Sequence, residues 1–315
     1  MEKEIGGYFG LEQAYGREFH EGLTAVNSGR NALLYIIRAK QIKKLYIPRF
    51  LCDSIWRLCQ REQVAYQEYG IDENFHPVFP RELGEGEWLY IVNYYSQLSD
   101  EQVLEWKKQY GRVILDNVQA FFCKPLPGVE TVYSCRKFFG VPDGGYVACQ
   151  ESLALETDVS RERMTHILGR FEDCGSAYYN YFRQNDEGFY ELPLREMSSI
   201  TRNILRTVDY EEVRRRRNAN YGVLAAALGT TNRLSLTVPD GPYCYPYYCE
   251  NGMQIKRLLA QKHIYIPTLW PEVLECGSDL EKDYAKNIMP LPCDQRYDAC
   301  DMQRMIHEIL CAIGE

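Results

Sequence analysis

Short apolar runs alternate with longer stretches of mixed apolar and polar residues along the first half of the chain. Runs rich in β-branched and aromatic residues, which are typical of strands, occupy residues 45–47, 64–69, 88–93, 112–115, 131–133 and 146–149. Helix-like stretches, with apolar residues every three or four positions, occupy residues 32–38, 53–61 and 99–110. Ser99 followed by Gln102 predicts the start of the third helix as a capping box. Strands that alternate with helices predict βαβ units, so we expect an α/β fold with a mostly parallel sheet.

Polar residues follow three of the predicted strands at the points where the strands end. These positions are residues 93–97, 116–119 and 134–137. The carboxyl ends of parallel strands share one edge of a sheet, and ligands of α/β proteins bind at that edge. The sequence therefore predicts a ligand site formed by the three strand ends.

Lys137 lies between a predicted strand end and a turn. The turn, Pro142-Asp-Gly-Gly145, has the residues of a tight turn, and the run after it returns as a strand. This arrangement mounts the lysine on a stiff support, and a desolvated lysine amine can form a Schiff base with a carbonyl. The alternative is that Lys137 is one surface lysine among many.

Small polar residues precede the first predicted helix. The segment Asn27-Ser-Gly-Arg30 leads into the apolar stretch at residues 32–38. Unpaired N–H groups at a helix N-terminus suit an anion such as phosphate. The alternative is a Ser or Asn cap with no ligand, and a helix cap is also the alternative explanation for Asp116.

The pattern changes after residue 150. Residues 151–190 are polar and helical in pattern, and residues 209–228 form a long predicted helix. A smaller layer of helices and strands is suggested by residues 236–248, 253–262, 264–266 and 302–313.

A chain of 315 residues is long enough for a large α/β domain and a smaller one. We expect the large domain at residues 1–195 and a small α+β domain at residues 196–315. Residues 1–25 are expected to contain a polar helical stretch and to pack on a neighbour.

The long helix carries four consecutive arginines, Arg214 to Arg217. Such a run suits nucleic acid, but Glu211 and Glu212 lie about one helical turn earlier, which favours ion pairing on a solvated face. The net charge of −8 also argues against general nucleic-acid binding, which needs a basic face.

Cysteine and histidine do not form a metal-binding pattern. The 12 cysteines contain no C-x-x-C pair and there are only 5 histidines, so we expect no metal site and free thiols. The charged start lacks an apolar signal core, and apolar windows are too short to span a membrane. We therefore expect a cytoplasmic protein with neither a membrane nor a nucleic-acid partner.

Four motifs in this order carry a resemblance. They are Asn27-Ser-Gly-Arg30, Asp116-x-x-Gln119, Ser134-x-x-Lys137 and Asp143-Gly-Gly145. Together they resemble the fold-type I enzymes that use pyridoxal phosphate (PLP), specifically the DegT/DnrJ/EryC1/StrS aminotransferase-like family. Residues 217–221, 268–271 and 291–297 extend the resemblance weakly into the small domain. The resemblance implies a PLP-binding α/β large domain, a small α+β domain, and a homodimer with its active site at the interface.

The resemblance also implies roles for the residues that match these motifs. Lys137 would form the Schiff base with PLP and then serve as general base and acid. Asp116 would pair with the pyridine nitrogen, and Gln119 would lie near the ring oxygen. Residues that would hold the phosphate are Ser28, Gly29, Arg30 and Ser134.

The chain departs from the family at three of these positions. Arg30 stands where relatives carry a small hydroxyl residue. Cys52 stands near the position of an aromatic residue that stacks on the cofactor ring, and Phe50 is the nearby aromatic. Ser134 lies closer to Lys137 than the family's phosphate serine does. These departures bear on the substrate more than on the cofactor.

The function implied is a PLP-dependent aminotransferase that moves an amino group from an amino acid such as glutamate to a keto acceptor. A nucleotide-linked keto sugar is the family's usual acceptor. Lys137 argues against the family's dehydratases, which carry histidine there. The alternatives are another PLP reaction such as elimination or decarboxylation, a non-catalytic member with a structural or regulatory role, and a doubly wound domain without PLP.

Overall fold

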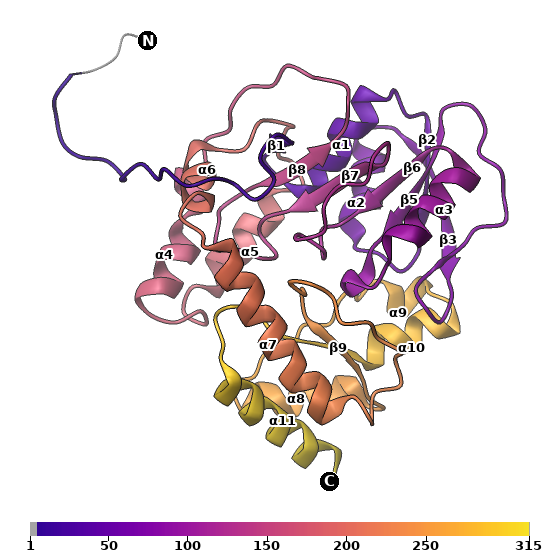
Figure 1. The fold of residues 1–315 in the computed structure, drawn as a ribbon, viewed down its shortest axis with the longest axis vertical. Coiled ribbons are helices and arrows are strands. Elements are labelled where there is room, and N and C mark those ends of the chain that lie inside the picture. The colour runs from indigo at the N-terminus through magenta and orange to yellow at the C-terminus, as the bar shows by residue number, and fades with distance from the viewer. Residues whose placement is uncertain (1–4, 315) are drawn as a thin grey trace.

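Eight strands form the central sheet, seen in a computed structural model that describes residues 5–314 (Figure 1). They are β1 Thr24–Val26, β2 Lys44–Pro48, β3 Ala65–Ile71, β4 Pro77–Val78, β5 Glu87–Val92, β6 Val113–Asp116, β7 Glu130–Ser134 and β8 Gly145–Ala148. The six predicted strands are confirmed with bounds shifted by one or two residues. The short strands β1 and β4 were not predicted.

The sheet is mostly parallel, as predicted. Its strand order is β1-β8-β7-β6-β5-β2-β3-β4. The neighbours β3, β2, β5, β6 and β7 pair in parallel, whereas β8 runs antiparallel to both β7 and β1. The reversal at β8 follows from the short turn after β7, since a parallel return would need a longer crossover.

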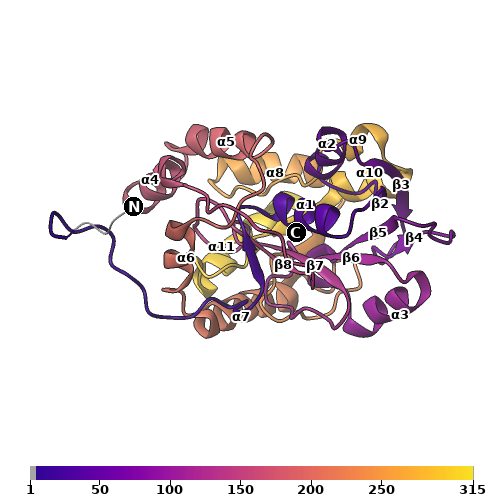
Figure 2. The ribbon, with the colours of Figure 1, turned by 90° about the horizontal axis from the view of Figure 1, so that it is seen from above.

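Helices cover both faces of this sheet. Those that follow β1, β2 and β5 are α1 Gly29–Ala39, α2 Asp53–Arg61 and α3 Asp100–Tyr110. Figure 2 shows α1 and α2 on one face and α3 on the other. The predicted capping box at Ser99 and Gln102 starts α3. The inner strands are therefore buried on both faces, which explains their continuous apolar runs.

The C-terminal part consists of a two-stranded antiparallel sheet and helices around it. The elements are α7 Tyr210–Leu228, β9 Tyr245–Tyr248, α8 Gly252–Gln261, α9 Val273–Cys276, α10 Asp279–Asn287, β10 Ile288–Leu291 and α11 Ala299–Ile313. Residues 264–266 have no regular secondary structure, because β9 pairs with β10 alone. No helix among residues 5–314 has the length and apolar character needed to cross a membrane.

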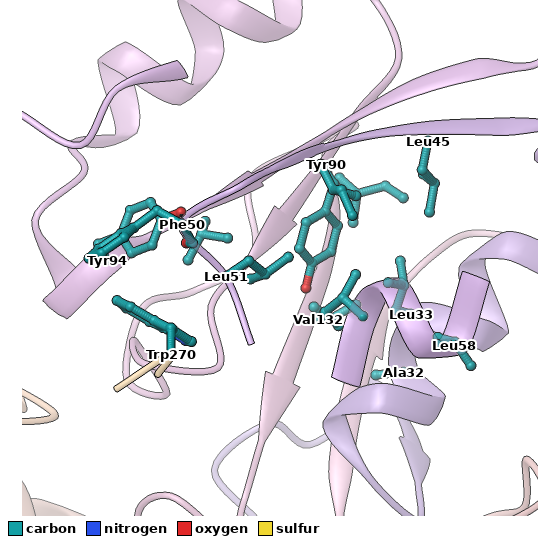
Figure 3. Packing of buried hydrophobic residues seen from close by; sticks show 14 of the residues in the cluster. Ala32, Leu33, Leu45, Phe50, Leu51, Leu58, Tyr90, Tyr94, Val132 and Trp270 are labelled. Atoms are coloured by element: carbon teal, nitrogen blue, oxygen red, sulfur yellow. Dashed lines mark hydrogen bonds between the residues drawn. The ribbon is translucent and has the colours of Figure 1, made fainter. Parts of the chain in front are cut away.

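The two parts pack against each other through aromatic and charged side chains. The Trp270 ring lies 4.6 Å from that of Phe50, and Arg49 pairs with the buried Glu281 at 3.0 Å. Figure 3 shows Phe50, Tyr94 and Trp270 together beside the sheet. The domain division at residue 195 stays a prediction.

Along the chain, three helices follow the last strand of the central sheet and precede α7. They are α4 Thr165–Glu172, α5 Tyr179–Gly188 and α6 Ser199–Leu205. Residues 151–160, which we expected to be helical, have no helix.

The expected polar helix near the N-terminus is absent from residues 5–23, and residues 1–4 lie outside the described part. Gly6 and Gly7 have φ values of 90° and 95°, outside the helical region. Phe19 and Leu23 pack against the apolar cluster around Phe121, whereas the large apolar side chains before them are exposed.

The arginine run on α7 divides into two groups. Glu212 pairs with Arg215 and Arg216 at 2.6 and 2.7 Å, as predicted for a solvated face. The expectation is wrong for Arg217, which is buried. Its guanidinium donates to the carbonyls of Phe138 and Pro242 over 3.2 and 2.7 Å, and to Gln295 over 2.8 Å.

Candidate active site

Asp116 is the last residue of β6 and is buried beneath the sheet edge. Its Oδ2 accepts a hydrogen bond from the Tyr90 hydroxyl at 2.6 Å, and its Oδ1 accepts one from the N–H of Val118 at 2.8 Å. The Tyr90 hydroxyl points to the α1 face of the sheet (Figure 3), so the carboxylate faces α1. No helix follows Asp116, so the helix-cap explanation is wrong.

Burial raises the pKa of Asp116, and the positive charge of Lys137 is the first influence that opposes the rise. Lys137 lies three residues beyond the end of β7 and is exposed. Burial raises the pKa of Cys52, and the positive charge of Lys137 is one of the influences that oppose this rise. The Nζ of Lys137 lies 5.6 Å from the centre of the Tyr243 ring. Lys137, Asp116 and Cys52, from three segments of the chain, therefore surround one site.

The turn after Lys137 fastens this segment to the start of α1. The N–H of Gly144 donates to the carbonyl of Asn27 over 2.9 Å, and Gly144 has a φ of 113°. A Cβ on Gly145 would lie 2.7 Å from the carbonyl carbon of Ser28. The Gly-Gly pair is thus required by a left-handed backbone and by a close approach.

The N-terminus of α1 lies directly beside the end of β7. The Ser28 hydroxyl accepts a hydrogen bond from the N–H of Asn31 at 3.0 Å, so Ser28 is a helix cap. A Cβ on Gly29 would lie 3.2 Å from the Cβ of Ser134, which shows how closely the helix approaches the strand. The first-turn N–H groups of Gly29 and Arg30 have no partner within the helix.

Arg30 brings a buried cation to the same helix end. Its Nε and Nη1 are buried and have no hydrogen-bond partner among residues 5–314. The guanidinium carbon lies 4.2 Å from the centre of the Tyr190 ring. Burial lowers the pKa of Arg30, while nearby Tyr190, Cys52 and Asp186 oppose that effect. Unpaired buried donors are costly, so this geometry suits an anion.

Besides Arg30, Gln119 also brings an unpaired hydrogen-bond donor to the site. Its Oε1 accepts a hydrogen bond from the N–H of Tyr95 at 2.9 Å, whereas its Nε2 is buried without a partner in the described chain. Tyr95 and Ser96 have φ values of 55° and 62°, which are strained for residues other than glycine. The Ser96 hydroxyl also donates to the Gln119 carbonyl over 2.6 Å.

The sequence prediction missed Arg136, which stands between two predicted site residues. It pairs with Asp186 at 3.1 Å, and its guanidinium lies 4.2 Å from the centre of the Phe189 ring. Burial lowers its pKa, and the charge of Arg30 lowers it further. Its position next to Lys137 was the only signal in the sequence.

Phe50 does not take the place of a stacking aromatic. It is buried against Trp270, and its carbonyl accepts a hydrogen bond from the Tyr94 hydroxyl at 2.5 Å. Cys52 stands at the N-cap position of α2, without a capping hydrogen bond from its side chain, and lies near the charge of Lys137. Among residues 5–314, no group of three or more His, Cys, Asp and Glu side chains is arranged to hold a metal ion.

The sequence matches no family model and no curated protein. Solved structures resemble it over almost the whole chain. DesV of S. venezuelae, solved with a ketimine intermediate, is 15% identical with a TM-score of 0.64, covering 93% of this chain and 85% of DesV. A DegT DnrJ EryC1 StrS aminotransferase of Brucella abortus is 14% identical with a TM-score of 0.62, covering 94% of this chain and 87% of its own.

The chain has the fold of the DegT/DnrJ/EryC1/StrS aminotransferases. NtdA of Bacillus subtilis, solved with bound cofactor PMP, gives a TM-score of 0.66 at 13% identity, over 93% of this chain and 73% of its own. The predicted fold class is therefore confirmed. Lys137, Asp116 and Gln119 lie at or just after the carboxyl ends of the neighbouring strands β6 and β7, beside the start of α1, and their roles toward a cofactor stay a prediction.

Proposed function

We propose that this protein is a PLP-dependent aminotransferase. The observation that carries the proposal is that Lys137 and the buried carboxylate of Asp116 come from neighbouring strand ends at one sheet edge, close enough for the lysine charge to act on the pKa of Asp116. A lysine beside a buried acid is what a cofactor with an aldehyde and a basic ring nitrogen requires. The fold supports the proposal, since its solved members include aminotransferases.

The remaining polar groups of the site fit the same cofactor. Asp116 would accept a hydrogen bond from the ring nitrogen, and the unpaired Nε2 of Gln119 would donate to the ring oxygen. Arg30 and the first-turn N–H groups of α1 would hold the phosphate, with Ser134 alongside. Ser28 would contribute to the phosphate site by capping the N-terminus of α1, and Cys52 would lie near the cofactor ring.

When bound, PLP supplies an electron sink that stabilises negative charge on the substrate carbon. Lys137 would bond to the cofactor and, once displaced by a substrate amine, would carry a proton between the substrate carbon and the cofactor carbon. Asp116 would keep the ring nitrogen protonated, because a buried carboxylate favours a cationic partner. Tyr243 lies beside the Lys137 amine and would limit its motion.

We propose an amino acid such as glutamate as the donor and a keto compound as the acceptor. A nucleotide-linked keto sugar is the preferred candidate, since the structural neighbour DesI was solved in the presence of its TDP-sugar product. The proposal includes a homodimer in the cytoplasm, with no membrane or nucleic-acid partner.

The first experiment is the absorbance spectrum of the purified protein with PLP, beside Lys137→Ala. We expect a visible band that borohydride abolishes in the wild type and that the variant lacks. Lys108→Ala, at an exposed lysine on α3, is the matched control and should keep the band. A wild-type protein without the band would contradict the proposal.

A non-catalytic PLP-binding protein is the second candidate. It is favoured by Cys52 in place of a stacking aromatic and by the Tyr190 ring that packs on Arg30. Addition of amino donors separates the two, because an aminotransferase converts bound PLP to its amine form. A stable band with every donor and no consumption of the donor would favour the non-catalytic role. A stable band with release of CO2 or of a leaving group from the donor would favour decarboxylation or elimination.

A further inference from the structure

The first residues of the described chain form an extended arm that leaves the body of the protein. Its large apolar side chains are Ile5, Tyr8, Phe9, Leu11 and Tyr15, each between 75% and 98% exposed. Single exposed apolar residues are common on protein surfaces, but five within eleven positions mark an interaction segment.

The root of this arm is fixed to α6. The N–H of Ala14 donates to Oδ1 of Asn203 over 2.8 Å, and Nδ2 of Asn203 donates to the carbonyl of Glu12 over 2.9 Å. A Cβ on Gly16 would clash with the carbonyl oxygen of Arg206, so the chain passes the end of α6 where only glycine fits. The exit direction of the arm is therefore set by the fold, and residues 5–11 extend beyond it into solvent.

Two helices near this root expose apolar side chains as well. The uncovered residues are Leu168 and Phe171 on α4, and Tyr179, Tyr181 and Phe182 on α5. Phe171 is 89% exposed, and the Tyr179 and Phe182 rings lie 5.9 Å apart. We call these five residues the α4–α5 patch. Figures 1 and 2 both show the arm leaving the molecule at the end where α4 and α6 lie.

We propose that the arm of one copy of this chain docks on the α4–α5 patch of a second copy, and that the exchange is reciprocal. The arm and the patch lie at the same end of the molecule, so a twofold axis near that end brings each arm to the other patch. An isologous contact of this kind buries both apolar sets at once, whereas the arm's own body leaves both exposed.

The docked arm would also border the candidate active site. The α5 residue Asp186 pairs with Arg136 at 3.1 Å, and the charge of Arg30 lowers the pKa of this arginine. The α5 part of the patch therefore lies on the helix that pairs with Arg136, near the proposed phosphate end of the site. The inference rests on the homodimer proposed above and specifies its contact surface, without requiring that PLP be bound.

Sedimentation velocity of the full-length protein over a range of concentrations tests the inference. We expect a dimer for the wild type, and at least a tenfold weaker dimer for the double variant Tyr8→Ser, Phe9→Ser and for Phe171→Ser. Val238→Ser, which removes an apolar side chain that is 75% exposed elsewhere on the chain, is the control and should leave the dimer unchanged. All four substituted side chains are exposed, so folding should be preserved, and circular dichroism checks this.

The native Cys174 between α4 and α5 is exposed and allows a direct test of proximity. Under mild oxidation, Phe9→Cys should form a disulfide-linked dimer that Cys174→Ser abolishes, whereas Val238→Cys should not. A wild-type monomer would overturn both this inference and the proposed homodimer. A wild-type dimer that none of the arm and patch variants weakens would overturn the arm exchange alone and leave the homodimer standing.

Discussion

The main-chain N–H of Tyr95 donates to Oε1 of Gln119 over 2.9 Å and so turns the amide nitrogen of Gln119 toward the candidate site. Tyr95 makes this contact from a left-handed backbone, and Ser96 continues it. Strain of this kind persists only where the surroundings hold it in place. Here it is held by the Ser96 hydroxyl on the Gln119 carbonyl and by Trp270 beside Tyr95.

Replacing Gln119 with alanine should weaken PLP binding by about tenfold or more, because a hydrogen bond to a charged group contributes about 1.5–3 kcal/mol. The measurement is a titration of apo protein with PLP followed by absorbance. Gln109→Ala, at an exposed position on α3, should leave the affinity unchanged. Equal affinity of Gln119→Ala and wild type would show that the amide does not contact the cofactor.

The strain at Ser96 can be measured with two substitutions. Ser96→Ala and Ser96→Gly both remove the hydroxyl that bonds the Gln119 carbonyl, but only alanine keeps the penalty of a φ near 62°. We expect the glycine variant to have the higher free energy of unfolding, by about 1 kcal/mol. Urea unfolding of the two variants provides the comparison, and equal stabilities would argue that the turn is unstrained.

Arg30→Met should have opposite effects on stability and on binding. Without ligand, removal of the buried unpaired donors should stabilise the fold, whereas loss of the contact with Tyr190 should destabilise it. The net result should be a free energy of unfolding that is higher by about 1 kcal/mol. Affinity for PLP should fall by about tenfold or more. Arg57→Met is the control, since Arg57 also lies over the Tyr190 ring but is half-exposed and paired with Asp53. A variant that is less stable and binds PLP normally would contradict the assigned role.

Acid should destabilise the protein through His20. Burial lowers its pKa from 6.5 to about 4, against a hydrogen bond to the Phe121 carbonyl. The unfolded chain therefore binds more protons than the folded one between these values, so stability falls as pH falls from 6.5 to 4. The loss should be about 3 kcal/mol. Unfolding of His20→Gln should depend less on pH over this range, whereas the exposed His307→Gln should behave as wild type.

Local sequence signals were sufficient for six strands of the central sheet, for α2 and for the capping box of α3, but not for the short strands β1 and β4. The helix α2 has its predicted bounds, Asp53–Arg61, because a polar start and an amphipathic run specify it without help from distant contacts. The position of Lys137, Asp116 and Gln119 at one sheet edge could be predicted because strand ends of a parallel sheet meet at one edge.

Other features depend on contacts between distant segments. The unpaired donors of Arg30 and Gln119 exist because Tyr190 and Tyr95, far away in the chain, occupy the space around them. The burial of Arg217 had a local signal that the arginine run obscured. Arg217 shares one helix face with Tyr221 and Leu224, at intervals of four and seven residues, and all three are buried.

The guanidinium of Arg217 joins the long helix α7 to both sides of the lysine. It holds the carbonyl of Phe138, the residue after Lys137, and the carbonyl of Pro242, the residue before Tyr243. Gln295 binds the same Phe138 carbonyl at 2.7 Å. A hinge that swung the C-terminal part away would have to break these bonds inside the protein. The lysine turn and the C-terminal part are thus held together as one body.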